Sequence, residues 1–290
     1  MQVILAAVVP VLLTALLGYG IARAGKPFDP RTITFIVGTI GTPVLIFNNL
    51  AHTSVAPEAL GGIIGATIVA MMCHLAIGYA ALRASGLSPQ TYLACMAFPN
   101  SGNLGLPLSL YAFGDEGLNY AIAIFAVISV SNHTIGQTIT AGQGRWRSAL
   151  LSPVVPAAVL GLAFGYFQIA LPIWVNNTLD LLSGLTIPLM LIMLGTSLAK
   201  IPVTTFSRAA YLSVLRIGMG AAVGFTIASL FGFTGAERGA FVLQCAMPVA
   251  VYNYVYSQIY NTSPESVASL VVVSTLLSII TVPLLLMVLA

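Results

Sequence analysis

Residues 97–114 read AFPNSGNLGLPLSLYAFG, and they interrupt an apolar run that is otherwise long enough to cross a membrane. Pro99 removes a backbone donor and its ring collides with the carbonyl four residues earlier, and Pro107 repeats this effect farther along. Gly102 and Gly105 allow backbone conformations that other residues resist. The stretch therefore predicts two half-helices joined by an irregular segment from Pro99 to Gly105.

The composition of the chain indicates that lipid surrounds most of it. Of its 290 residues, 58% are hydrophobic and 6% are charged, whereas a soluble globular protein carries about 25% charged residues. The net charge is +3 and the sequence has no basic cluster, which argues against a nucleic-acid partner. Cys73, Cys95 and Cys245 lie inside apolar runs without a C-x-x-C spacing, so we interpret them as small packing residues.

The apolar runs predict an all-α integral membrane protein with ten transmembrane helices. A spanning helix needs about 20 consecutive apolar residues, and cutting the chain at its polar and charged clusters yields ten such segments. Their limits are 2–22, 32–51, 60–82, 90–113, 118–140, 149–171, 177–199, 209–231, 239–260 and 266–289. The first run has no positive charge before Arg23, which a cleaved signal peptide would need, so we expect it to remain as the first span.

The basic residues predict the orientation of the chain in the cytoplasmic membrane. Loops after odd-numbered spans contain eight of the ten lysines and arginines, namely Arg23, Lys26, Arg31, Arg83, Arg145, Arg147, Lys200 and Arg208. Loops after even-numbered spans contain only Arg238, and Arg216 lies within a span. Because cytoplasmic loops carry the excess of lysine and arginine, we expect the odd-numbered loops inside the cell and both termini outside.

A polar stretch divides the ten spans into two sets of five. We predict a first repeat over 1–141, a short cytoplasmic linker over 142–148 and a second repeat over 149–290. An odd number of spans in each half inverts the second half in the membrane. TPVLIFNNLA matches IPLMLIMLGTSLA in the placing of a proline, and CMAFP matches QCAMP. The alternative is that common prolines coincide by chance.

The two breaks, in the fourth and ninth spans, have a functional interpretation. The N-terminal end of a half-helix presents free N–H groups and about half a positive charge, and such an end attracts an anion. Interrupted spans at matching places in two halves of a transporter indicate its substrate site. Asn100, Ser101 and Asn103 add polar side chains at the first break, and Pro248 marks the second. A kink used only for packing is the alternative.

The segment FPNSGNLGLPL resembles the fourth-span signature of the auxin efflux carrier family, which includes plant PIN-type carriers and bacterial organic-acid permeases. AMPVAVYNYVYSQIYN and VVVSTLLSIITVPLLL look like the last two spans of that family, and the resemblance covers the whole chain. It implies a five-plus-five inverted fold whose fourth and ninth spans cross at the midplane, as in bile-acid symporters. It also implies elevator-like transport of small carboxylates, a homodimer, and a crossover role for Pro99, Asn100 and Pro248.

Other polar residues in the spans are further candidates for the substrate site. Asn132 and His133 lie near the middle of the fifth span. His133 could bind a carboxylate or carry a proton, and hydrogen bonding between helices is the alternative for both. Tyr252 and Asn253 follow the second break, where stacking on an aromatic acid and ordinary packing are both open, and Asn48 ends the second span.

Charged residues inside the spans are few. We expect Arg216 to snorkel to the cytoplasmic interface or to bind a structural partner, although it could also attract an anion. Asp180 lies near the start of the seventh span, so no acidic residue is expected at the membrane centre. This absence favours passive or potential-driven movement, or sodium held by carbonyls and amides, and it leaves sodium and protons open as coupling ions. No other cofactor is expected.

The sequence therefore favours a secondary transporter that moves small organic anions, such as auxin-like or dicarboxylic acids, by elevator-type alternating access. An anion channel or ligand-gated pore on the same scaffold is the alternative. An enzyme is disfavoured, because the chain contains no H-E-x-x-H motif, no G-x-S-x-G motif and no paired acids within its spans. No metal site is expected.

Overall fold

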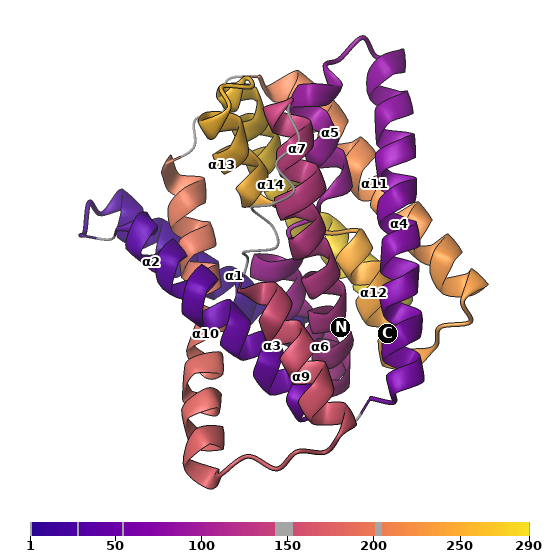
Figure 1. Ribbon diagram of the computed structural model, residues 1–290. Coiled ribbons are helices and arrows are strands. Elements are labelled where there is room, and N and C mark those ends of the chain that lie inside the picture. Colours follow the sequence, from indigo (N-terminus) through magenta and orange to yellow (C-terminus); the bar gives the residue numbers. More distant parts are fainter. Residues whose placement is uncertain (1, 28, 54, 143–152, 201–204, 290) are drawn as a thin grey trace.

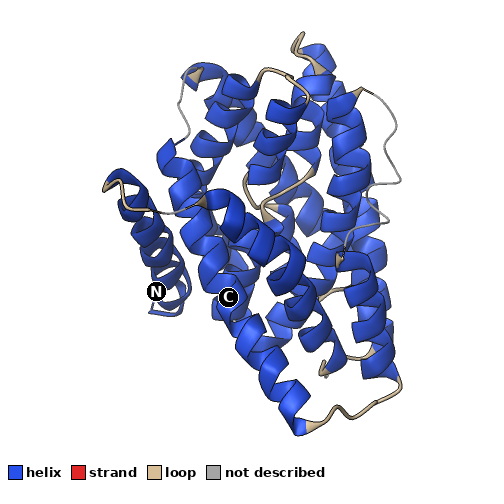
Figure 2. Cartoon of the chain, turned by 60° about the vertical axis from the view of Figure 1, so that its left-hand side comes forward, coloured by secondary structure: helices blue, strands red, loops and turns tan. Residues whose placement is uncertain are grey.

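A computed structural model describes residues 2–27, 29–53, 55–142, 153–200 and 205–289, and this part of the chain is helical, without strands (Figure 2). The elements are α1 (Gln2–Arg23), α2 (Pro30–Ile36), the π-helical η1 (Val37–Gly41), α3 (Thr42–Ala51), α4 (Pro57–Ala84), α5 (Pro89–Ala97), the π-helical η2 (Ser101–Gly105), α6 (Leu106–Ser131), the π-helical η3 (Asn132–Gly136), α7 (Gln137–Ala141), α9 (Val154–Tyr166), α10 (Ile173–Lys200), α11 (Phe206–Leu230), α12 (Gly235–Cys245), α13 (Val251–Ile259) and α14 (Pro264–Leu289). The predicted all-α class is confirmed.

Six of the described helical segments are long and apolar enough to cross a membrane. They are Leu5–Arg23, Glu58–Ala84, Ser101–Ala141, Ile173–Ala199, Phe206–Leu230 and Pro264–Leu289. Val37–Ala51 and Val154–Tyr166 are shorter apolar helices, and the expected spans 90–113 and 239–260 are interrupted. Of the expected linker 142–148, the structure describes only Gly142, and 143–148 lie outside the described residues. A multi-pass membrane protein follows from these helices, and the count of ten spans stays a prediction.

Local sequence signals explain where several helices begin. Proline is tolerated in the first turn because its missing N–H has no helical acceptor there. Accordingly α2, α4, α5 and α14 each begin at a proline. Ser88 caps α5, since its hydroxyl oxygen accepts a hydrogen bond from the backbone N–H of Thr91. Gly114, with φ of 69°, places a bend inside α6 between the expected fourth and fifth spans.

The helices pack in two sets (Figure 1). In the first set, α1 packs along α10, and α3 packs against α9 and α10. Gly195 allows the close contact of α10 with α1, because a Cβ there would overlap the carbonyl oxygen of Ala15. The second set contains α4, α5, α6, α7, α11, α12, α13 and α14, and its buried apolar core is shared by α4, α5, α6, α11, α12 and α14. The two sets meet where α10 contacts η2 and where α1, α3 and α9 contact α6.

The second set holds a crossover of two broken helices. α5 ends at Ala97 and α12 ends at Cys245, and the chain then runs extended past the opposite segment before η2 and α13 begin. The N–H of Asn100 donates to the carbonyl oxygen of Pro248 at 2.7 Å, and the N–H of Ala250 donates to that of Phe98 at 3.4 Å. This short antiparallel pairing satisfies backbone groups that would otherwise be unpaired in hydrocarbon.

Arg216 was expected to snorkel or to bind a structural partner, and the structure shows the structural partner. Its side chain is fully buried between helices of the second set and does not snorkel to an interface. Ten residues of α11 precede it, which is about 15 Å of helix. The carbonyl oxygen of Cys245 accepts a hydrogen bond from its Nη2 at 3.1 Å. The neighbouring turns of α11 and α12 therefore cover Arg216, and its side chain does not reach the surface.

Candidate functional site

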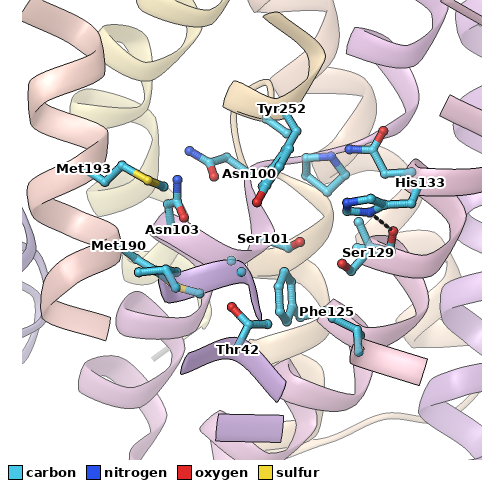
Figure 3. Close-up of a pocket in the computed structure, with 18 of the residues that line it drawn as sticks. Thr42, Asn100, Ser101, Asn103, Phe125, Ser129, His133, Met190, Met193 and Tyr252 are labelled. Carbon is cyan, nitrogen blue, oxygen red and sulfur yellow. Dashed lines mark hydrogen bonds between the residues drawn. The ribbon is translucent and has the colours of Figure 1, made fainter. Parts of the chain in front are cut away.

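A cavity of about 400 Å³ lies where the two sets of helices meet (Figure 3). This volume falls in the range of pockets that bind small molecules. The first set contributes lining residues from α2, η1, α3, α9 and α10, and the second contributes residues from both halves of the crossover and from α6 and η3. The cavity therefore has one wall on each set.

Six predicted substrate-binding residues line this cavity. They are Asn100, Ser101, Asn103, Asn132, His133 and Tyr252, and the predicted break residues Pro99 and Gly102 line it as well. Tertiary packing brings together residues from η2, η3 and α13 that are far apart in the chain. These residues form the candidate substrate site.

Two helix N-termini adjoin the cavity. η2 begins at Ser101 and leads directly into α6, while α13 begins at Val251 after Ala250. The first N–H groups of a helix have no acceptor one turn earlier, and they carry a partial positive charge. Ser101, Gly102 and Asn103 provide such groups in η2, so the cavity wall is suited to a negatively charged ligand.

Asn100 supplies a side-chain donor that lacks a protein partner. Its side chain is 4% exposed, and Nδ2 has no hydrogen-bond acceptor among the described residues. Asn132 Oδ1 is likewise buried without a donor. A buried polar group without a partner costs about 1–3 kcal/mol, so these two amides are suited to bind a ligand that offers both an acceptor and a donor or a water molecule.

His133 is held with one ring nitrogen occupied. Nδ1 lies 2.8 Å from the carbonyl oxygen of Ser129 (Figure 3), and because a carbonyl can only accept, Nδ1 carries the hydrogen. The imidazole packs near two tyrosine rings, with centroid distances of 5.5 Å to Tyr252 and 6.2 Å to Tyr256. Nε2 is then the nitrogen that can accept a hydrogen bond from a ligand or take up a proton.

The cavity lining is otherwise neutral. Among its described lining residues there is no aspartate, glutamate, lysine or arginine. Backbone N–H groups, amides, hydroxyl groups and His133 therefore supply its electrostatic character. No group of three or more histidine, cysteine, aspartate or glutamate residues suited to a metal ion occurs in the part of the chain that the structure describes.

Two predicted site residues lie elsewhere. Asn48 donates through Nδ2 to Asp180 Oδ1 at 2.9 Å and to Ser183 Oγ at 3.3 Å, so it joins α3 to α10 instead of lining the cavity. Asn253 points back to the first break, where Nδ2 donates to the carbonyl oxygens of Ala94 at 3.3 Å and Phe98 at 3.4 Å. Both asparagines connect helices.

The remaining break residues shape the crossover. Gly102 lies against the ring of Phe125, because an added Cβ would be 2.8 Å from Cε2 of that ring. A Cβ at Gly105 would overlap the side-chain amide of Gln244, so this glycine allows η2 to contact α12. Pro107 is in the first turn of α6, where the helix tolerates it. Pro248 contributes its carbonyl oxygen to the pairing with Asn100.

Several lining residues were not candidates on sequence grounds. Thr42, Phe125, Ser129, Met190 and Met193 line the cavity and are drawn with it in Figure 3. Met190 and Met193 follow Pro188, a proline noted in the seventh span, but apolar side chains in a span carry no polar signal. Their flexible thioethers can adapt to ligands of different shape.

Comparisons with known proteins agree on one class. The profile of a family described as "Membrane transport protein" matches residues 3–145 and 137–286. An "Uncharacterized transporter" of Methanothermobacter thermautotrophicus is 29% identical over 295 residues, covering 96% of this chain and 95% of the relative. One from Methanocaldococcus jannaschii is 26% identical over 298 residues, covering 94% and 95%. A "Putative malonate transporter" of Rhizobium meliloti is 24% identical over 267 residues, covering 86% and 83%.

Proposed function

We propose that this chain, which belongs to the membrane transport protein family, is a secondary carrier of small organic anions with carboxylate groups. The family match confirms the resemblance seen in FPNSGNLGLPL. A membrane transporter acts on a small-molecule substrate, and the cavity between the two helix sets is the place where such a substrate would bind.

One observation carries the proposal. The unpartnered amide nitrogen of Asn100 and the first N–H groups of η2 meet at a cavity whose described lining contains no acidic residue. Hydrogen bonds from such donors to a charged group contribute about 1.5–3 kcal/mol each. A carboxylate offers two acceptor oxygens and one negative charge, which suits this set of donors.

A short dicarboxylate is the substrate class that we favour. The malonate named for the Rhizobium meliloti relative is such a molecule. Within this chain, the η2 donors and His133 lie on the same cavity and are offered by different segments, so two carboxylates of one ligand could be bound separately. His133 would then lie beside the second carboxylate.

The proposed mechanism is alternating access. The cavity has one wall on the α1, α3, α9 and α10 set and one on the crossover set, so sliding of one set against the other would change the side from which the cavity opens. For this mechanism we propose the ten-span, five-plus-five inverted fold, with repeats over 1–141 and 149–290. We also propose the orientation with both termini outside the cytoplasmic membrane, and a homodimer.

Reconstituted vesicles test the carrier proposal. We expect saturable uptake of labelled malonate into liposomes that contain the purified protein, competed by other short dicarboxylates and not by malonamide, the neutral diamide of the same shape. An outward bias is expected when the membrane potential is negative inside, because 100 mV on one charge is about 2.3 kcal/mol. Equal competition by malonamide, or no uptake of any mono- or dicarboxylate, would refute the proposal. Electrical currents far above carrier turnover would instead establish a channel.

A further inference from the structure

Arg216 is a buried charge outside the cavity. It is the largest fully buried side chain among the described residues, and it does not line the candidate substrate site. Nη2 donates to the carbonyl oxygen of Cys245, while Nε and Nη1 have no hydrogen-bond partner among the described residues. An arginine buried this deeply is normally paired with a carboxylate, so the identity of its counter-charge decides its role.

No aspartate or glutamate side chain in the described part of the chain provides this counter-charge. The seven acidic residues of the chain are Asp29, Glu58, Asp115, Glu116, Asp180, Glu237 and Glu265. Each of them is exposed or only partly buried, and none forms an ion pair with Arg216. Among the described residues, the acceptor that receives a hydrogen bond from its guanidinium is the backbone carbonyl oxygen of Cys245. The negative partner of Arg216 must therefore come from the backbone.

The crossover supplies negative backbone charge at this place. Cys245 is the last residue of α12, and Cys95 lies in the last turn of α5. The unpaired carbonyls at a helix C-terminus together carry about half a negative charge. The end of α12 therefore lies beside Arg216, where the carbonyl oxygen of Cys245 receives the hydrogen bond from Nη2. α11 packs against both half-helices, which places the guanidinium behind the crossover.

Carriers with broken helices commonly place a coupling cation at this kind of location. Half-helix N-termini point at the anionic substrate, whereas unwound carbonyls and half-helix C-termini coordinate Na⁺ or H⁺. Here a covalently attached cation already lies at the C-terminal end of α12. Gly220 makes room for it, because an added Cβ would lie 2.7 Å from Nη1.

We propose that Arg216 is a tethered cation that takes the place of a coupling ion at the crossover, so that the crossover keeps its charge without bound sodium. Arg216 is then a positioning residue: it stabilises the C-terminal ends of the two half-helices and thereby holds the N-terminal ends of η2 and α13 at the cavity. Its effect on substrate binding rests on the proposed carrier function, whereas its effect on the crossover does not.

Three substitutions separate charge, volume and packing. Arg216→Met keeps a long side chain without charge, Arg216→Lys keeps a charge, and Arg216→Ala leaves a space that free guanidinium can enter. Arg238→Ala is the control, because Arg238 is an exposed arginine that stacks near Phe225. The first readout is the apparent Tm of the purified, substrate-free protein in sodium, choline or low-millimolar guanidinium chloride. This readout needs no substrate, so it tests Arg216 even if the carrier proposal fails.

The expected pattern depends on charge. The wild-type protein and Arg238→Ala should have the same Tm in sodium and choline. Arg216→Met and Arg216→Ala should lose about 5 °C or more, Arg216→Lys should retain most of the wild-type value, and guanidinium should raise the Tm of Arg216→Ala alone. In vesicles, wild-type uptake should not require sodium, and Arg216→Met should be slower by about tenfold or more, the factor that corresponds to 1.4 kcal/mol.

Two results would overturn the inference. One is uptake or Tm of the wild-type protein that depends on sodium, since a coupling ion would then be needed despite Arg216. The other is a wild-type Tm in Arg216→Met together with no response of Arg216→Ala to guanidinium. If Arg216→Ala does not fold, the Tm values of Arg216→Lys and Arg216→Met test the inference. An equal loss of Tm in both variants would show that the site requires packing and not charge, and would overturn the inference.

Discussion

Asn100 and Asn253 form a matched pair for testing the site. Both are buried asparagines at the crossover, at 4% and 2% exposure, yet their amide groups are used differently. Nδ2 of Asn100 has no partner among the described residues, whereas Nδ2 of Asn253 donates to two backbone carbonyls of the first break. Asn100→Ala should therefore mainly weaken ligand binding, whereas Asn253→Ala should mainly lower stability.

The size of each effect follows from these hydrogen bonds. Asn100→Ala removes a donor to a charged ligand group, worth about 1.5–3 kcal/mol, so the Kd for a dicarboxylate should rise by roughly 10- to 150-fold. The ligand-free protein loses no hydrogen bond, and the space left joins a cavity of about 400 Å³, so its Tm should stay the same or rise. Asn253→Ala removes two hydrogen bonds of about 1 kcal/mol each, which corresponds to a fall of about 4–8 °C.

The assay is thermal unfolding of the purified protein with and without malonate, with Kd taken from a titration of the same samples. Asn100→Ala should keep its ligand-free Tm and lose most of the shift caused by malonate. Asn253→Ala should unfold at lower temperature and keep a larger share of that shift. If Asn100→Ala instead unfolds as early as Asn253→Ala and still binds malonate with wild-type affinity, the amide of Asn100 is structural and the proposed site is wrong.

Three further predictions concern packing, ligand binding and protonation. Gly195→Ala should destabilise the protein by about 1–3 kcal/mol, because the new methyl group would overlap α1, whereas Gly20→Ala, with open space around it, should not lower the Tm. His133→Gln removes an imidazole that lines the cavity, so it should raise the Kd for dicarboxylates, and an unchanged Kd would contradict a role of this ring in binding. Burial and the nearby Glu116 raise the pKa of Glu237, so stability should fall as pH rises from the ordinary range of a glutamate through the raised pKa. Glu237→Gln should remove that loss in a pH series of melting curves, and an unchanged series would refute this account.

The broken helices show how far local sequence reasoning reaches. Pro99, Gly102 and Pro248 act on their own backbone, through a missing N–H, a missing Cβ and a fixed φ. These effects are encoded in the residue type and do not depend on distant parts of the chain. The position of each break could therefore be expected before any contact was known, and so could the polar character of Asn100, Ser101 and Asn103.

Asn253 and Arg216 show where such reasoning ends. Asn253 was grouped with Tyr252 because both follow the second break. Adjacent residues of a helix point about 100° apart, so Tyr252 lines the cavity and Asn253 points to Phe98. For Arg216 the sequence left two outcomes open, snorkelling to the interface or a structural partner inside the protein, because a long side chain in an isolated span can reach the interface. Packing of α11 against α12 buries it instead.

The sequence by itself determined the membrane environment, the helical class, the family and the breaks in the expected fourth and ninth spans. Apolar length, charge content and proline act locally along the chain, so these features could be predicted without knowledge of tertiary contacts. The tertiary structure alone decided which side chains share the cavity, that Met190 and Thr42 form a wall opposite Asn100, and that Arg216 donates to the carbonyl oxygen of Cys245. These are properties of how helices from distant parts of the chain are rotated and paired, and no residue type encodes the rotation of its helix against a neighbour that lies more than a hundred residues away.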